Sequence, residues 1–163
     1  MALNTKYVEN SGHIVGVSDR VDLTEQASQP APFNPNEKQV GGSHYRAGFQ
    51  HWDLVAYNHM GYFEAQITKY ITRWKKKNGA QDVEKSCHYL EKLQSLLEAK
   101  VLEYPPARRI VKLDEFAGQN KLSLLERLIF QIVMSYTSKE ELLALKGYLD
   151  LLLEQAHGEP LVK

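Results

Sequence analysis

From His51 onward, apolar residues recur at spacings of three and four, which is the pattern of amphipathic helices. A first short run ends near Gly61. The second run has its apolar positions at Phe63, Ile67, Tyr70, Ile71 and Trp74. Asn78 and Gly79 should end this helix, because glycine adopts the left-handed conformation that closes helices and the lysines before it suit the negative helix end.

A third helix is predicted directly after Gly79. Asp82 lies near its positive N-terminus, where an acidic side chain is favourable. One face of the helix carries Val83, Ser86, Cys87, Leu90, Leu93 and Leu97. Because only a short bend separates the second helix from the third, the two should form an antiparallel hairpin.

Two further helices are predicted at residues 122–136 and 138–157, and both are rich in Leu and Ile. Their apolar positions are numerous enough to bury one side and leave a surface for self-association. Ser138 should cap the last helix, since its hydroxyl can accept a hydrogen bond from an unpaired backbone N–H of the first turn. Glu140 and Glu141 should interact favourably with the positive end of the helix dipole.

The pattern predicts an all-α fold, with a helical hairpin core, additional C-terminal helices and a flexible N-terminal arm. Residues 1–37 are rich in Ser, Asn, Gln, Gly and Pro and are expected to be the mobile arm. Residues 38–103 should form the helical domain that carries a functional site. Residues 104–163 should add the structural or oligomerising helix pair, after a linker at 104–121 that contains Pro105 and Pro106.

Composition narrows the possible partners. The 163 residues are 43% apolar, which is enough for one core, and 20 Lys and Arg balance 20 Asp and Glu. The chain therefore has no overall charge to draw it to nucleic acid or anionic lipid. Cys87 is the one cysteine, which excludes an intrachain disulfide and fits a reducing compartment. Without a signal-peptide pattern or a run of about 20 apolar residues, a cytoplasmic protein that does not insert into membranes is expected.

The second helix carries a stripe of cations on the side opposite its apolar face. Lys69, Arg73, Lys76 and Lys77 belong to it, and Glu64 is the acid at the start of the helix. One interpretation is a solvated face that keeps the helix soluble. The other is an anion site, since mutual repulsion among the cations would be relieved by a polyphosphate or a neighbouring subunit.

A glycine pair lies just before the helices, in the sequence Gly41-Gly42-Ser43-His44-Tyr45. Paired glycines let backbone amides approach an anion, and His44 and Tyr45 can supply directed donors. An ordinary turn would have the same composition. The chain contains no GxxxxGK[ST] motif, so phosphate binding by a P-loop is excluded.

Asp82 is the acid closest to the cationic stripe along the chain. Its carboxylate could hold Mg²⁺ or orient an attacking phosphate. It could also serve only as a helix-start acid that interacts with the dipole. The histidines and Cys87 do not have the spacing of a zinc site.

The stretches KQVGGSHY, KYITRWKKKNG and DVEKSCHYLEKL together resemble a family of small phage proteins that includes a nucleotide kinase without a Walker motif. The resemblance covers about residues 37–98. It implies phosphoryl transfer from a nucleoside triphosphate to a deoxynucleoside monophosphate, by a homo-oligomer in the host-cell cytoplasm. Ser43 stands where an acidic residue is common in the family.

The resemblance also implies roles for individual residues. Lys69 and Arg73 would clamp phosphates, His44 would bond a phosphate oxygen or move a proton, and Asp82 would complete the catalytic set. The substrate-binding residues would be Lys38, Gly41, Gly42, Tyr45, Lys76, Lys77, Asn78, Lys85 and Tyr89. The cofactor would be the triphosphate donor, with Mg²⁺ as an additional possibility.

Two other functions stay open at this point. All-α nucleoside triphosphate pyrophosphatases share the helical architecture, but they depend on a dense carboxylate cluster, and here only Glu64 and Asp82 are available. A binding module for nucleic acid or a host protein would use the basic helix alone, and it would show strong salt dependence. The neutral overall charge makes the nucleic-acid partner the less favoured one.

Overall fold

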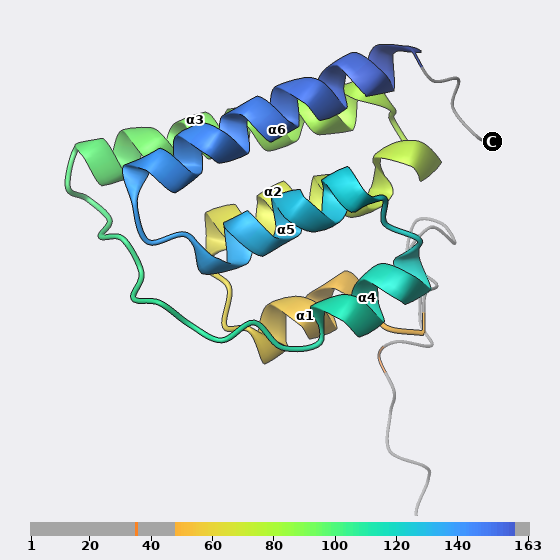
Figure 1. Ribbon diagram of the computed structural model, residues 1–163, viewed down its shortest axis with the longest axis horizontal. Coiled ribbons are helices and arrows are strands. Elements are labelled where there is room, and N and C mark those ends of the chain that lie inside the picture. Colours follow the sequence, from red (N-terminus) through yellow and green to blue (C-terminus); the bar gives the residue numbers. More distant parts are fainter. Residues whose placement is uncertain (1–34, 36–47, 159–163) are drawn as a thin grey trace, which may run out of the picture. The chain divides into compact units, whose positions relative to one another are not determined.

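The computed structural model describes residue 35 and residues 48–158 (Figure 1). This part of the chain is all-α, as predicted. No helix within it is both long and apolar enough to cross a bilayer. The predicted arm, apart from residue 35, and five candidate site residues lie outside the described residues; the five are Lys38, Gly41, Gly42, His44 and Tyr45.

Three helical segments and a turn make up the first part. They are α1 (His51–Tyr57), α2 (Tyr62–Arg73), the 3₁₀ turn η3 (Trp74–Lys76) and α3 (Ala80–Glu98). The predicted hairpin is confirmed, since α2 packs along α3. Gly79 has φ 56° and ψ −135°, a backbone conformation that favours glycine but is not the left-handed helical one expected to close the helix, and it directly precedes α3. The α-helix ends earlier than expected, however, because residues 74–76 tighten into the 3₁₀ turn.

Helices α5 (Leu124–Ser135) and α6 (Lys139–Gly158) follow the predicted boundaries within two residues. Ser138 Oγ accepts the backbone N–H of Glu141, which confirms the predicted cap of α6. Figure 1 shows α6 beside α3 and α5 beside α2, and both pairs are in contact. The described residues of the two predicted domains therefore pack together within one compact unit.

The core lies between these helices. Its fully buried side chains come from every helix except the short 3₁₀ turn, and the largest are Phe116, Phe130, Leu54, Ile67, Ile71, Leu90, Leu93, Ile129, Met134, Leu142, Leu145 and Leu149. Ser86, on the apolar face of α3, is buried with them and donates its hydroxyl to the Ile67 carbonyl at 3.0 Å. This bond fixes α3 against α2 and leaves no unpaired hydroxyl in the core.

The prediction of a linker at 104–121 was wrong for its second half. Residues 113–120 form helix α4 (Leu113–Asn120), which packs on α1 and α5. Phe116 is fully buried, and the Asn120 side chain donates to the Phe49 carbonyl at 3.1 Å. A helix of eight residues with Gly118 inside has little stability of its own, so tertiary packing rather than local pattern forms it.

Phe116→Ala should lower the free energy of unfolding by about 3–5 kcal/mol, because the ring packs against Phe49 and Phe130 at centroid distances of 5.8 and 5.5 Å and its loss leaves a cavity. Urea denaturation followed by circular dichroism measures the change. Gly118→Ala in the same helix is the control. A methyl group there meets nothing within 4 Å, so this variant should be as stable as the wild type or up to about 1 kcal/mol more stable. Equal effects of the two substitutions would contradict the packing described for α4.

Candidate functional site

The turn between α2 and α3 is built on an ion pair. Arg73 donates from Nε to Asp82 Oδ2 at 3.0 Å and from Nη2 to Asp82 Oδ1 at 3.3 Å. Oδ1 also accepts from Asn78 Nδ2 at 2.9 Å and from Lys85 Nζ at 3.1 Å. The two-pronged guanidinium contact holds the last turn of α2 against the first turn of α3.

The carboxylate of Asp82 has no exposed surface. Burial is the largest influence on its pKa and raises it, but the hydrogen bonds from Asn78, Arg73 and Lys85 together hold the pKa of Asp82 below its usual value. The group is therefore ionised at neutral pH, and it stabilises the fold at any pH above its ordinary range.

Arg73 thus differs from its expected position on an exposed stripe. Arg73 is only 8% exposed, and Asp82 is sealed beneath it. The expectation that the cations of α2 need an outside anion is not met for Arg73, because its counter-ion comes from the same chain. Asp82 holds Arg73 and Lys85 in place and has no open oxygen for Mg²⁺ or for a phosphate acceptor.

Two tyrosines lie beside the ion pair. The rings of Tyr70 and Tyr89 stack with centroids 5.7 Å apart and an angle of 21° between their planes. Arg73 Cζ is 4.5 Å from the centre of the Tyr70 ring, Lys85 Nζ is 5.5 Å away and Lys69 Nζ is 5.7 Å away. Three cations of α2 and α3 therefore gather around one aromatic ring, where cation–π attraction offsets part of their repulsion.

The 3₁₀ turn is tied to α5 through a second buried carboxylate. Glu126 is 1% exposed, and it accepts from Trp74 Nε1 at 2.6 Å and from Lys75 Nζ at 2.9 Å. It also accepts the backbone N–H of Ser123 at 2.5 Å, which completes a capping box at the start of α5. The capping box itself is visible as Ser123-x-x-Glu126 in the sequence. Its link to the basic segment is not, because the partners are some fifty residues apart.

Three further lysines of the basic segment differ in exposure. Lys76 and Lys77 are exposed, and Lys69, which lies over the Tyr70 ring, is half-buried. The structure therefore brings six of the predicted site residues together around the hairpin turn, namely Lys69, Arg73, Asn78, Asp82, Lys85 and Tyr89, with Lys76 and Lys77 on the turn itself.

His51 is a partly buried residue to which the sequence analysis assigned no role, and it makes a polar contact with α2. The Thr68 hydroxyl donates its hydrogen to the Glu64 carbonyl at 2.8 Å, so it accepts from Nε2 of His51, also at 2.8 Å. Burial first, and then the nearby charge of Lys69, lowers the pKa of His51 to about 3. The ring is therefore neutral at physiological pH.

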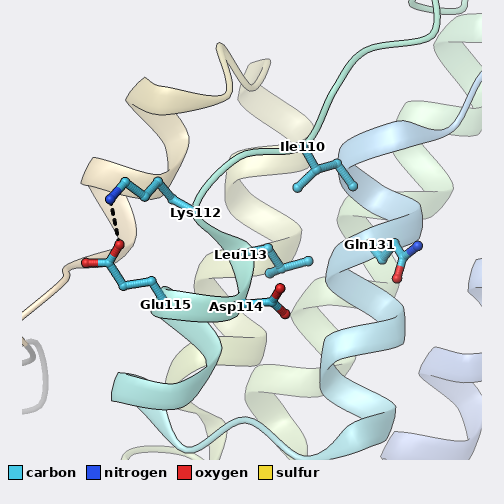
Figure 2. A pocket seen from close by; sticks show the side chains of 6 residues that line it. All are labelled: Ile110, Lys112, Leu113, Asp114, Glu115 and Gln131. Carbon is cyan, nitrogen blue, oxygen red and sulfur yellow. Dashed lines mark hydrogen bonds and ion pairs between the residues drawn. The ribbon is translucent and has the colours of Figure 1, made fainter.

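A separate pocket of about 450 Å³ opens between α4 and α5. Figure 2 shows Leu113 and Asp114 of α4 facing Gln131 of α5, with Lys112 paired to Glu115 at 2.7 Å on one side. None of the predicted site residues lines it. Within the described residues, no group of three or more His, Cys, Asp and Glu side chains is placed to hold a metal ion.

Residues 39–91 match the model of a family described as "Protein of unknown function (DUF3310)". The matched segment includes α1, α2, η3 and α3 as far as residue 91, and so contains the whole hairpin turn. No curated protein and no solved structure matches the chain.

His51 should make stability depend on pH. Its folded-state pKa lies below the ordinary value of 6.5, so the unfolded chain binds the proton more readily. The stability that neutral His51 provides is complete above about pH 6.5 and falls as the pH drops toward about 3. Between pH 7 and pH 5 the wild type should lose about 2 kcal/mol more than His51→Gln, measured by urea unfolding. His88→Gln is the control, because that side chain is 83% exposed, and it should follow the wild type.

Glu126→Gln should cost about 2 kcal/mol of stability and should change the environment of Trp74, because a neutral amide replaces a buried carboxylate that accepts from Trp74, Lys75 and Ser123. The measurements are urea unfolding and the emission of Trp74 in a Trp52→Phe background. The exposed Glu140→Gln on α6 is the control and should change neither. Unchanged Trp74 emission in Glu126→Gln would show that this contact does not hold the turn.

Proposed function

We propose that the protein is a nucleotide kinase, which transfers a phosphoryl group from a nucleoside triphosphate to a deoxynucleoside monophosphate at the α2–α3 hairpin. The observation that carries the proposal is the gathering of Lys69, Arg73 and Lys85 around Tyr70, supported from beneath by Asp82. The motif resemblance described above supports the same activity.

The arrangement suits phosphoryl transfer because this reaction needs little covalent help from the protein. It depends on holding two phosphate groups together and on offsetting charge as the terminal phosphoryl leaves the donor and bonds to an acceptor phosphate oxygen. Lys69, Lys76 and Lys77 have solvent access, and they are proposed to contact the phosphates. Lys75 is also partly exposed, but it pairs with Glu126. Arg73 acts beside them mainly as a fixed positive charge, since two of its nitrogens bond Asp82.

Asp82 and Lys85 have positioning roles in this proposal. Asp82 holds the guanidinium of Arg73 and the ammonium of Lys85 on either side of the turn at 3.0 and 3.1 Å. Preorganised charges stabilise a transition state without reorganising during the reaction. His44 and the glycine pair lie outside the described residues, and their phosphate-binding roles stay a prediction from the sequence.

Mg²⁺ does not fit Asp82 as a direct ligand. Both carboxylate oxygens are engaged by protein donors and neither is exposed. No step of the proposed mechanism is therefore assigned to a metal held by this residue.

The pyrophosphatase alternative depends on the same two acids. Glu64 is buried and accepts the hydroxyl of Tyr136 at 2.7 Å, and Asp82 is enclosed by cations. Neither carboxylate is open to a metal-bound triphosphate, which favours the kinase.

Self-association remains part of the proposal. Leu124 is 76% exposed and Leu128 37% exposed on α5, while Leu143 and Leu151 are 53% and 54% exposed on α6. Apolar side chains left in solvent on two neighbouring helices suit a homo-oligomer.

The test incubates the purified protein with each deoxynucleoside monophosphate and a panel of triphosphates, with and without Mg²⁺, and separates the products by ion-exchange chromatography. A deoxynucleoside diphosphate should appear, and Lys69→Ala should lower kcat/KM about 100-fold by removing a phosphate contact. Lys146→Ala, which removes an exposed lysine from α6, is the matched control and should keep full activity.

Other products would decide among the alternatives. Monophosphate and pyrophosphate formed from the triphosphate alone would establish a pyrophosphatase. An absence of turnover with every pair, together with salt-sensitive binding of long polyanions, would establish a binding module.

A further inference from the structure

We infer that Tyr62, backed by Tyr89, is the surface on which the nucleobase stacks. This inference rests on the proposed function and adds to it the place and the physical basis of base binding. Tyr62 is the first residue of α2 and was not among the residues singled out in the sequence.

The three tyrosines of the hairpin form a continuous aromatic series. Tyr62 meets Tyr89 with centroids 6.1 Å apart and planes at 72°, and Tyr89 in turn stacks on Tyr70. Tyr62 also contacts Phe63 edge-to-face at 5.3 Å. These two ring contacts restrict the motion of the Tyr62 ring, which lowers the side-chain entropy that stacking a base on it would cost.

Tyr62 differs from the rings that support it by its exposure. It is 63% exposed, whereas Tyr70 and Tyr89 are half-buried. A hydrogen bond with Tyr89, followed by the charge of Tyr89 and partial burial, raises the pKa of Tyr62, so its phenol is neutral at physiological pH. A neutral ring that is supported by other rings and largely open to solvent is the kind of surface on which bases stack.

The cations lie at the other end of the same aromatic series. At 100° per residue, Tyr62, Lys69 and Arg73 share one face of α2, and the 1.5 Å rise places Lys69 about 10 Å and Arg73 about 16 Å along the axis from Tyr62. Lys69 and Arg73 both lie over the Tyr70 ring. The face therefore changes from aromatic to cationic along the helix, which matches a ligand with a base at one end and phosphates at the other.

A surface of this kind would bind bases by their flat faces. Stacking energy depends on ring area and not on the hydrogen-bonding edge, because every base has a π-face. The contribution of Tyr62 should therefore be shared by all nucleotides that the protein binds, and phosphate contacts by the lysines should be independent of it.

Isothermal titration calorimetry tests this with the four deoxynucleoside monophosphates and with deoxyribose 5-phosphate, which has the phosphate but no base. For each nucleotide that binds the wild type, Tyr62→Leu should lower the affinity by roughly 5- to 100-fold. The affinity for deoxyribose 5-phosphate should not change. Tyr62→Phe keeps the ring and should bind as the wild type does. Tyr57→Leu is the matched control, because Tyr57 is 57% exposed on α1, and it should have no effect.

Three results would overturn the inference, and they separate it from the proposed function. Unchanged nucleotide binding by Tyr62→Leu, with diphosphate formation by the wild type, would remove the stacking role and leave the kinase standing. An equal loss for deoxyribose 5-phosphate would show that the substitution disturbs the phosphate contacts and not base stacking. If the wild type bound none of the nucleotides, the inference and the proposed function would fail together.

Discussion

The ion pair between Arg73 and Asp82 joins the end of α2 to the start of α3 almost entirely out of water. Removing one partner of such a pair leaves an uncompensated buried charge and typically costs about 3–5 kcal/mol, more than a surface pair would contribute. Asn78 and Lys85 bond the same carboxylate, so the turn has one favoured arrangement. The positions of the tyrosines and the lysines on both helices depend on that arrangement.

A second buried acid, Glu126 of α5, binds the same basic segment. It binds Trp74 and Lys75 while it caps α5. The segment KYITRWKKKNG thus divides its cations by environment. Arg73 and Lys75 meet acids of the chain itself, whereas Lys76 and Lys77 face solvent. A cationic stripe in a sequence can therefore be partly structural and partly available to a ligand.

Local patterns were enough to predict the hairpin, the bend at Gly79 and the cap of α6, because each depends on residues within a few positions of one another. Helix α4 escaped prediction because its formation depends on packing by Phe116 and not on its own periodicity. The pairing of Arg73 with Asp82 was also missed. Helical spacing placed Arg73 on the outer stripe, but the spacing cannot show that the neighbouring helix presents a carboxylate to its guanidinium. The position of Tyr62 depends in the same way on a ring from α3.

The segment that matches a family model, residues 39–91, is held in place by hydrogen bonds to residues outside it. Asn120 bonds the carbonyl of Phe49, Tyr136 bonds Glu64, and Glu126 bonds Trp74 and Lys75. The side chain of Asn58 pairs with both backbone groups of Val111. Each helical element between residues 49 and 76 thus has a polar partner on or near α4 or α5. These partners are buried or partly buried, so water cannot replace them without leaving core atoms unpaired. The geometry of the proposed site is therefore a property of the whole helical unit and not of the hairpin alone.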